Sequence, residues 1–222
     1  MTILDWISSN YIELFGAVTG IIYVFLEIKQ TIWLWPVGIL TSAVYIWVFF
    51  TSKIYADMSL QIYYLVISIL GWYWWTRGKE QGAEGKGHRA QGKGPEEVSV
   101  RKGEREKEEL QVTRVTLKTG IVLTIVFVIL YLAMWLILTR LTDSPVPVRD
   151  AFITSLSIIA TWMLARKIYE HWYLWIVVNF VSAVLFMTRG LYPTVILYIV
   201  YGVMSFGGLV AWKKTIPRNN EV

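Results

Sequence analysis

Long apolar runs separated by short polar stretches form the dominant pattern of the sequence. A helix needs roughly 20 apolar residues to cross about 30 Å of hydrocarbon, and seven runs approach that length. They are 11–28, 33–50, 56–75, 120–141, 151–165, 172–187 and 191–212. The fifth and sixth runs are short and semi-polar. The pattern predicts an all-α integral membrane protein with seven transmembrane helices.

An internal repeat supports the two weaker helices. Residues 13–77 align without a gap on residues 150–214. Two apolar segments built from few residue types match at some positions by chance. Such matches rarely include tryptophan, tyrosine and glycine together. The shared residues include Phe15/Phe152, Ile21/Ile158, Trp35/Trp172, Phe49/Phe186, Tyr55/Tyr192, Tyr64/Tyr201, Gly71/Gly208 and Trp75/Trp212. The sequence therefore predicts that one three-helix unit occurs twice.

The fourth run explains how both units can have the same orientation. Three crossings end on the side opposite their start, so a parallel second copy requires one additional crossing between them. We therefore expect a first repeat at 11–75, an inverting fourth helix at 117–141 and a second repeat at 148–214. Parallel repeats in a three-plus-one-plus-three order occur in transporters, which hold their substrate between the repeats near mid-membrane.

The stretch 76–116 differs in composition from the rest of the chain. It is rich in Gly, Glu, Lys and Arg, with few large apolar residues. Its Gly-Lys-Gly pieces lack the following Ser or Thr of a phosphate-binding loop. The composition predicts a disordered cytoplasmic linker.

Composition and charge support the membrane assignment and suggest an orientation. Hydrophobic residues make up 55% of the chain, well above the share in soluble domains. The net charge of +5 does not indicate nucleic-acid binding, because the basic residues lie almost entirely in loops. Four Lys and Arg residues fall on the N-terminal side and the other 17 of 21 on the opposite side. We therefore expect the N-terminus outside and the C-terminus in the cytoplasm. Residues 1–10 show no signal-peptide pattern.

The sixth run carries the most specific candidate site. Trp172, Trp175 and Asn179 are spaced i, i+3 and i+7, which places them on one helical face. Trp172 could instead be an interfacial anchor, but an unpaired amide at the depth of Asn179 would be costly. In the first repeat, small residues occupy two of the equivalent positions, Gly38 and Ser42. This asymmetry favours a ligand whose two ends differ.

Other polar or flexible positions are weaker candidates. Gln61, Tyr64, Tyr198 and Tyr201 could contact a ligand, although such residues also make interhelical hydrogen bonds. Pro36 has no proline counterpart in the second repeat and is a candidate hinge. Ordinary helix packing is the alternative for each.

Charged and catalytic groups are scarce within the predicted helices. No Lys or Arg lies deep inside a span, since Arg140 falls at the end of the fourth run, and this argues against a nucleotide as substrate. Glu27, Asp57 and Glu170 lie close to loops and His171 stands alone, so we expect an uncharged cavity and passive movement. We find no catalytic residues, metal site or cofactor motif, which argues against an enzyme. Indole faces without a countercharge suit a flat cation such as a pyridinium or thiazolium.

Several motifs resemble the PnuC family of bacterial vitamin transporters. In the second half these are Leu156-Ser157-Ile158-Ile159-Ala160, Arg166-Lys167, Glu170-His171-Trp172-Tyr173-Leu174-Trp175 with Asn179, and Leu191-Tyr192. In the first half they are Tyr55-Ala56-Asp57, Leu60-Gln61 and Gly71-Trp72-Tyr73-Trp74-Trp75. The resemblance covers the chain apart from the linker.

This resemblance implies a SWEET-like fold, a homotrimer, and uptake of nicotinamide riboside by facilitated diffusion across the bacterial inner membrane. It also implies that a cytoplasmic kinase traps the substrate by phosphorylation. Trp172, Trp175 and Asn179 would bind the substrate, with Gln61 a weaker candidate. The segment 33–38 is more similar to the thiamine branch of the family, so thiamine or another aromatic vitamin is the alternative. A membrane-embedded enzyme and a structural scaffold are the rival classes.

Overall fold

The computed structural model describes residues 11–51, 55–77, 110–142 and 145–216. These residues form seven α-helices, which confirms the predicted all-α class. The helices are α2 (Tyr11–Ile28), α3 (Leu34–Thr51), α4 (Tyr55–Arg77), α7 (Leu117–Leu141), α8 (Pro147–Ala165), α9 (His171–Thr188) and α10 (Tyr192–Lys213).

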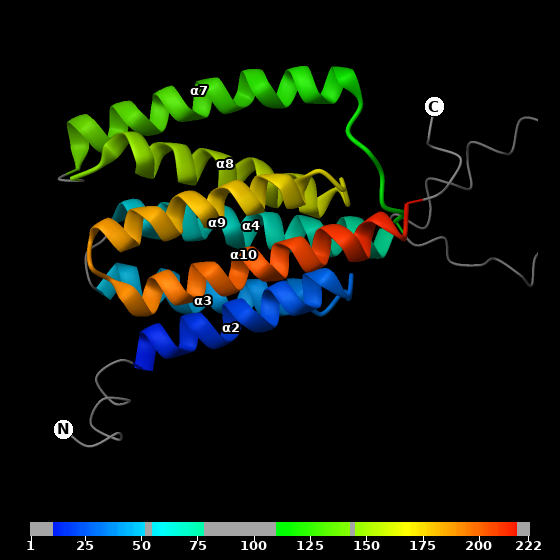
Figure 1. Cartoon of the computed structure of the whole chain (residues 1–222), viewed down its shortest axis with the longest axis horizontal. Helices are drawn as coiled ribbons and strands as arrows, with labels where there is room; N and C mark the ends of the chain where they lie inside the picture. The colour runs from blue at the N-terminus through cyan, green and yellow to red at the C-terminus, as the bar shows by residue number, and fades with distance from the viewer. Residues whose placement is uncertain (1–10, 52–54, 78–109, 143–144, 217–222) are drawn as a thin grey trace, which may run out of the picture.

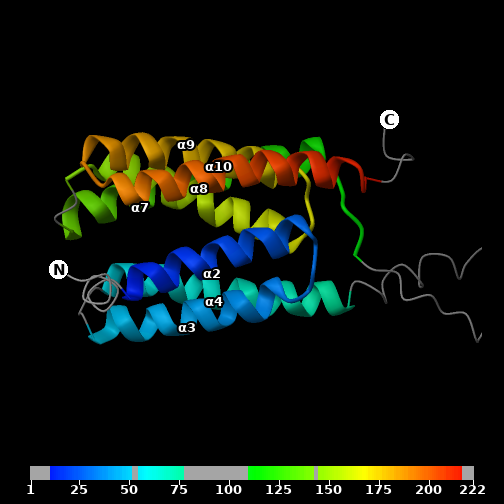
Figure 2. The same ribbon diagram turned by 60° about the horizontal axis from the view of Figure 1, so that its bottom comes forward.

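The helices run alongside one another as an elongated bundle (Figure 1). Helices α2, α3 and α4 form one triplet, and α8, α9 and α10 form another (Figure 2). The triplets meet where α10 packs on α2 and where α4 packs on α8. Helix α7 packs on the outside of α8. The start of α2 lies at one end of the bundle and the end of α10 at the other (Figure 1). We call the latter the C-terminal end.

The composition of the helices matches a bilayer environment. Within the described residues, α3, α7, α8, α9 and α10 are each long and apolar enough to span a membrane. Helix α2 is apolar over the shorter stretch Leu14–Ile28. Helix α7 buries none of its residues within the protein. An apolar helix exposed in this way requires lipid around it.

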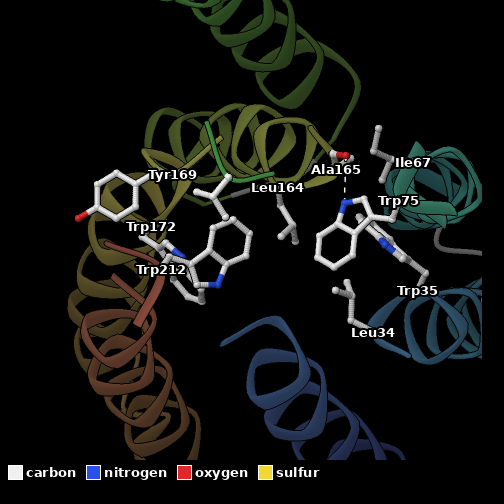
Figure 3. Packing of buried hydrophobic residues seen from close by; sticks show 10 residues of the cluster. Leu34, Trp35, Ile67, Trp75, Leu164, Ala165, Tyr169, Trp172 and Trp212 are labelled. Atoms are coloured by element: carbon white, nitrogen blue, oxygen red, sulfur yellow. Dashed lines mark hydrogen bonds between the residues drawn. The ribbon is translucent and has the colours of Figure 1, made fainter. Parts of the chain in front are cut away.

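A cluster of aromatic residues joins the two triplets at the C-terminal end (Figure 3). Trp35 meets Trp75 edge-on, with ring centroids 5.4 Å apart, and Trp172 meets Trp212 in the same way at 5.8 Å. The second tryptophan of each pair donates a hydrogen bond to the other triplet. Nε1 of Trp75 donates to the carbonyl of Ala165 at 3.2 Å, and Nε1 of Trp212 donates to the carbonyl of Glu27 at 3.0 Å. The triplets thus hold each other by reciprocal contacts.

Two glycines make room for the first tryptophan of each pair. A Cβ atom on Gly71 would meet the ring of Trp35, and a Cβ atom on Gly208 would meet the ring of Trp172. The residues at all four positions also match in the sequence alignment of the two halves. Only glycine leaves space for an indole this close to a helix backbone.

Residues 110–116 form a strap across the loop between α8 and α9. The amide of Thr113 donates to the carbonyl of Lys167 at 3.0 Å, and the amide of Tyr169 donates to the carbonyl of Thr113 at 2.9 Å. Val112 is buried in the aromatic cluster. Residues 110–116 are therefore packed against the rest of the protein, although they belong to the segment predicted to be a disordered linker. The remainder of that linker, 78–109, lies outside the described residues.

Candidate ligand cavity

A cavity of about 500 Å³ lies between the two triplets. All six helices of the triplets line it, whereas α7 does not. Many of the residues that line it occupy equivalent positions in the alignment of the two halves of the chain. Examples are Gly38/Trp175, Ser42/Asn179, Tyr64/Tyr201 and Ser68/Ser205. The volume is in the range of small-molecule sites.

The predicted binding residues gather around this cavity. Its lining includes Trp172, Trp175, Asn179, Gln61, Tyr64 and Tyr201, together with Tyr198. The structure thus brings together residues that lie more than a hundred positions apart in the chain. Their role in binding stays a prediction.

Pro36 does not line the cavity. It occupies the first turn of α3, where a backbone N–H has no partner within the helix. Proline there begins a helix without releasing a carbonyl or forcing a bend. The hinge stays a prediction, but the kink on which it was based is not expected at this position.

The indole groups of α9 present unused donors in the cavity wall. Trp172 exposes 0% of its surface, which excludes the alternative that it is an interfacial anchor. Nε1 of Trp172 and Nε1 of Trp175 are buried and have no hydrogen-bond partner among the described residues. A buried N–H without a partner is costly. Both groups are therefore suited to a ligand that offers acceptors.

Asn179 is held in place by α10. Its Nδ2 donates to Oγ of Ser205 at 3.2 Å, and that hydroxyl donates to the carbonyl of Tyr201 at 2.8 Å. Because the hydroxyl proton is committed to the carbonyl, the Ser205 oxygen acts as the acceptor for the amide. The carbonyl oxygen of the Asn179 side chain then lies on the other side of the carboxamide. It is the part of the group that could accept a hydrogen bond from a ligand.

Two expectations about charge are wrong. Glu27 lies next to the end of α2, as predicted, but it is 2% exposed and lines the cavity. His171 does not stand alone, because its Nε2 lies 3.0 Å from Oε1 of Glu27. The sequence held a signal for this pair, since the alignment sets Glu27 against Leu164 and His171 against Leu34. Charged groups at positions that are apolar in the other triplet indicate a specific partner.

Ionisable side chains are scarce around the cavity in the described part of the chain. There, no group of three or more metal-ligating side chains comes together. Among the described residues that line the cavity there is no Lys or Arg, and Glu27 is the one acidic residue. The described lining offers mainly aromatic faces, hydroxyls and amides.

Comparisons with known proteins agree with this geometry. The chain is 25% identical to the nicotinamide riboside transporter PnuC of Escherichia coli (strain K12) over 215 residues, which cover 91% of this chain and 85% of the relative. It is also 25% identical to the riboflavin/roseoflavin transporter RibM of Streptomyces davaonensis over 219 residues, covering 94% and 92%.

A solved structure shares the fold. The crystal structure of the vitamin B3 transporter PnuC superposes with a TM-score of 0.67 and 23% identity, covering 96% of this chain and 85% of that one. The profile of the nicotinamide mononucleotide transporter family matches residues 10–214. Because the match spans nearly the whole chain, this protein belongs to the nicotinamide mononucleotide transporter family, the membrane transporters that include PnuC.

Proposed function

We propose that this multi-pass protein of the bacterial inner membrane carries nicotinamide riboside into the cell. The cavity supports this substrate class. Its indoles and tyrosines offer flat faces to a pyridinium ring, and cation–π contacts contribute roughly 0.5–2 kcal/mol each when desolvated. Hydroxyls and amides around them suit a ribose. Relatives named as nicotinamide riboside transporters match over most of the chain.

An unphosphorylated substrate fits the cavity better than a nucleotide. A phosphate group is normally bound by Arg, Lys or clustered backbone N–H groups. The described lining supplies no basic side chain and one carboxylate, Glu27. This observation carries the choice of the riboside over its phosphate.

We assign substrate binding to Trp172, Trp175, Asn179, Gln61, Tyr64 and Tyr201. The support is their common position on the cavity wall and the unpartnered indole N–H groups of Trp172 and Trp175. The triplets act as two parallel repeats of a SWEET-like transporter, with α7 as the inverting helix. The reciprocal bonds of Trp75 and Trp212 support this symmetry.

Transport runs by facilitated diffusion, and a cytoplasmic kinase traps the substrate by phosphorylation. Glu27, the acid of the described cavity lining, is paired with His171 at 3.0 Å, so it is not left without a partner that a coupling ion would have to supply. We place the N-terminus outside, the C-terminal end of the bundle in the cytoplasm, and three copies in the assembly. The distribution of Lys and Arg supports the orientation. Native mass spectrometry of the detergent-purified protein tests the trimer.

Uptake into proteoliposomes tests the function directly. The purified protein should move labelled nicotinamide riboside down its gradient without an ion gradient, and Trp175→Ala should abolish most of that uptake. Trp47→Ala is the matched control, because Trp47 is 69% exposed on the outside of the bundle. Strict dependence on sodium or protons would refute facilitated diffusion.

Other aromatic vitamins are the second candidates. The similarity to the RibM transporter favours riboflavin as one alternative, and the segment 33–38 favours thiamine. Calorimetric titration of the same preparation with all three vitamins decides between them. Tighter binding of thiamine or riboflavin than of nicotinamide riboside would replace the proposed substrate.

A further inference from the structure

The buried contact between Glu27 and His171 joins the two triplets beside the cavity. His171 is the first residue of α9, and Glu27 lies near the end of α2. The two side chains are 0% and 3% exposed, and their nearest atoms are 3.0 Å apart. The His171 ring also packs on Trp172 and Trp212, with centroids 4.7 Å away in each case. The pair is thus built into the wall that carries the candidate binding residues.

The hydrogen bonds of His171 define the charge arrangement. Nδ1 lies 2.7 Å from the carbonyl of Ile168, which can only accept, so Nδ1 carries a proton. A second proton is then shared between Nε2 and Oε1 of Glu27. Glu27 lines the cavity and His171 does not. When the shared proton lies on His171, the pair is a dipole with its negative end toward the cavity.

The equivalent contact between the triplets, formed by the matching positions of the other repeat, shows that the fold does not need charged groups here. The positions equivalent to Glu27 and His171 are Leu164 and Leu34 in the alignment of the two halves. Both leucines are 0% exposed and belong to the cluster between the triplets. Two leucines therefore form one contact and an ionisable pair forms the other. Buried ion pairs are often no more stabilising than apolar residues of similar size, so stability alone does not account for an ionisable pair at one of the two equivalent places.

We propose that Glu27 determines the preference of the cavity for positively charged ligands and that His171 positions its carboxylate. The inference rests on the proposed function, since it concerns the substrate of the same cavity. A cation in the cavity meets Glu27 as the one acidic side chain of the described lining, and no Lys or Arg opposes it. Its positive charge stabilises the form in which the shared proton rests on His171. A neutral ligand of the same shape gains nothing from this polarisation.

Binding of a matched pair of probes tests the proposal. Nicotinamide riboside carries a pyridinium charge, whereas its reduced dihydro form is nearly the same size and uncharged. Calorimetry should show that Glu27→Gln weakens binding of the cation about tenfold and changes binding of the neutral form less than about twofold. Glutamine keeps the size of the side chain and removes its charge. Glu170→Gln is the control, because Glu170 accepts a bond from the amide of Val115 and does not line the cavity.

A double variant covers the case in which Glu27→Gln fails to fold. Changing Glu27 and His171 both to leucine copies the equivalent contact between the triplets, so the protein should fold and lose its preference for the cation. Equal weakening of both probes, or no change in their ratio, would overturn the proposal and leave a packing role only. If the unaltered protein binds neither probe, the proposed function fails and this inference fails with it.

Discussion

Gly208, which makes room for the ring of Trp172, offers a test of whether Trp172 belongs to the binding wall of the cavity. Gly208→Ala adds a methyl group where the ring of Trp172 already lies. Overpacking of this kind costs about 1–3 kcal/mol, while alanine in place of a helical glycine returns about 1 kcal/mol. The net loss of stability is then up to about 2 kcal/mol. The indole must shift, and because Trp172 lines the cavity, ligand affinity should fall.

The opposite triplet supplies the control for this variant. Gly71→Ala meets the ring of Trp35 in the same manner, but Trp35 does not line the cavity. Both variants should therefore lose similar stability in thermal melts. Loss of one aromatic contact is worth about 1 kcal/mol, so Gly208→Ala should bind nicotinamide riboside about fivefold more weakly in calorimetry, and Gly71→Ala should bind as the unaltered protein does. Equal loss of affinity in both would refute the placement of Trp172 in the binding wall.

Three further changes probe other contacts. Ser205→Ala removes the acceptor of the Asn179 amide and should weaken binding about two- to tenfold; unchanged affinity in calorimetry would show that Asn179 needs no support. Trp212→Phe removes the bond to the carbonyl of Glu27 and should cost about 1 kcal/mol, which thermal melting measures as a lower midpoint; an unaltered midpoint would contradict the reciprocal clamp. Val112→Asp places a carboxylate at a position that is 2% exposed and should destabilise the protein by more than about 2 kcal/mol, whereas a wild-type midpoint would mean that the strap detaches freely.

The helices and much of the cavity wall were predictable from local patterns. Run length and apolar content determine which segments cross a bilayer, because an unpaired backbone cannot remain in hydrocarbon. The spacing of Trp172, Trp175 and Asn179 fixes their common face within one helix. All three lie in the wall of the cavity. These features depend on residues near one another in the chain.

The pairing of distant groups depended on the tertiary structure. Glu27 and His171 are 144 positions apart, and the sequence placed Glu27 close to a loop and left His171 without a partner. Their contact exists because α2 packs on α10 and α10 packs on α9. No pattern of neighbouring residues in the sequence encodes this packing. The strap of 110–116 was missed for the same reason, since its hydrogen-bond partners lie in the loop before α9. The sequence by itself determined which segments enter the membrane and which faces carry aromatic groups. Only the packing of the two triplets decided that an acid lies in the cavity wall, because burial and partners are properties of the assembled bundle.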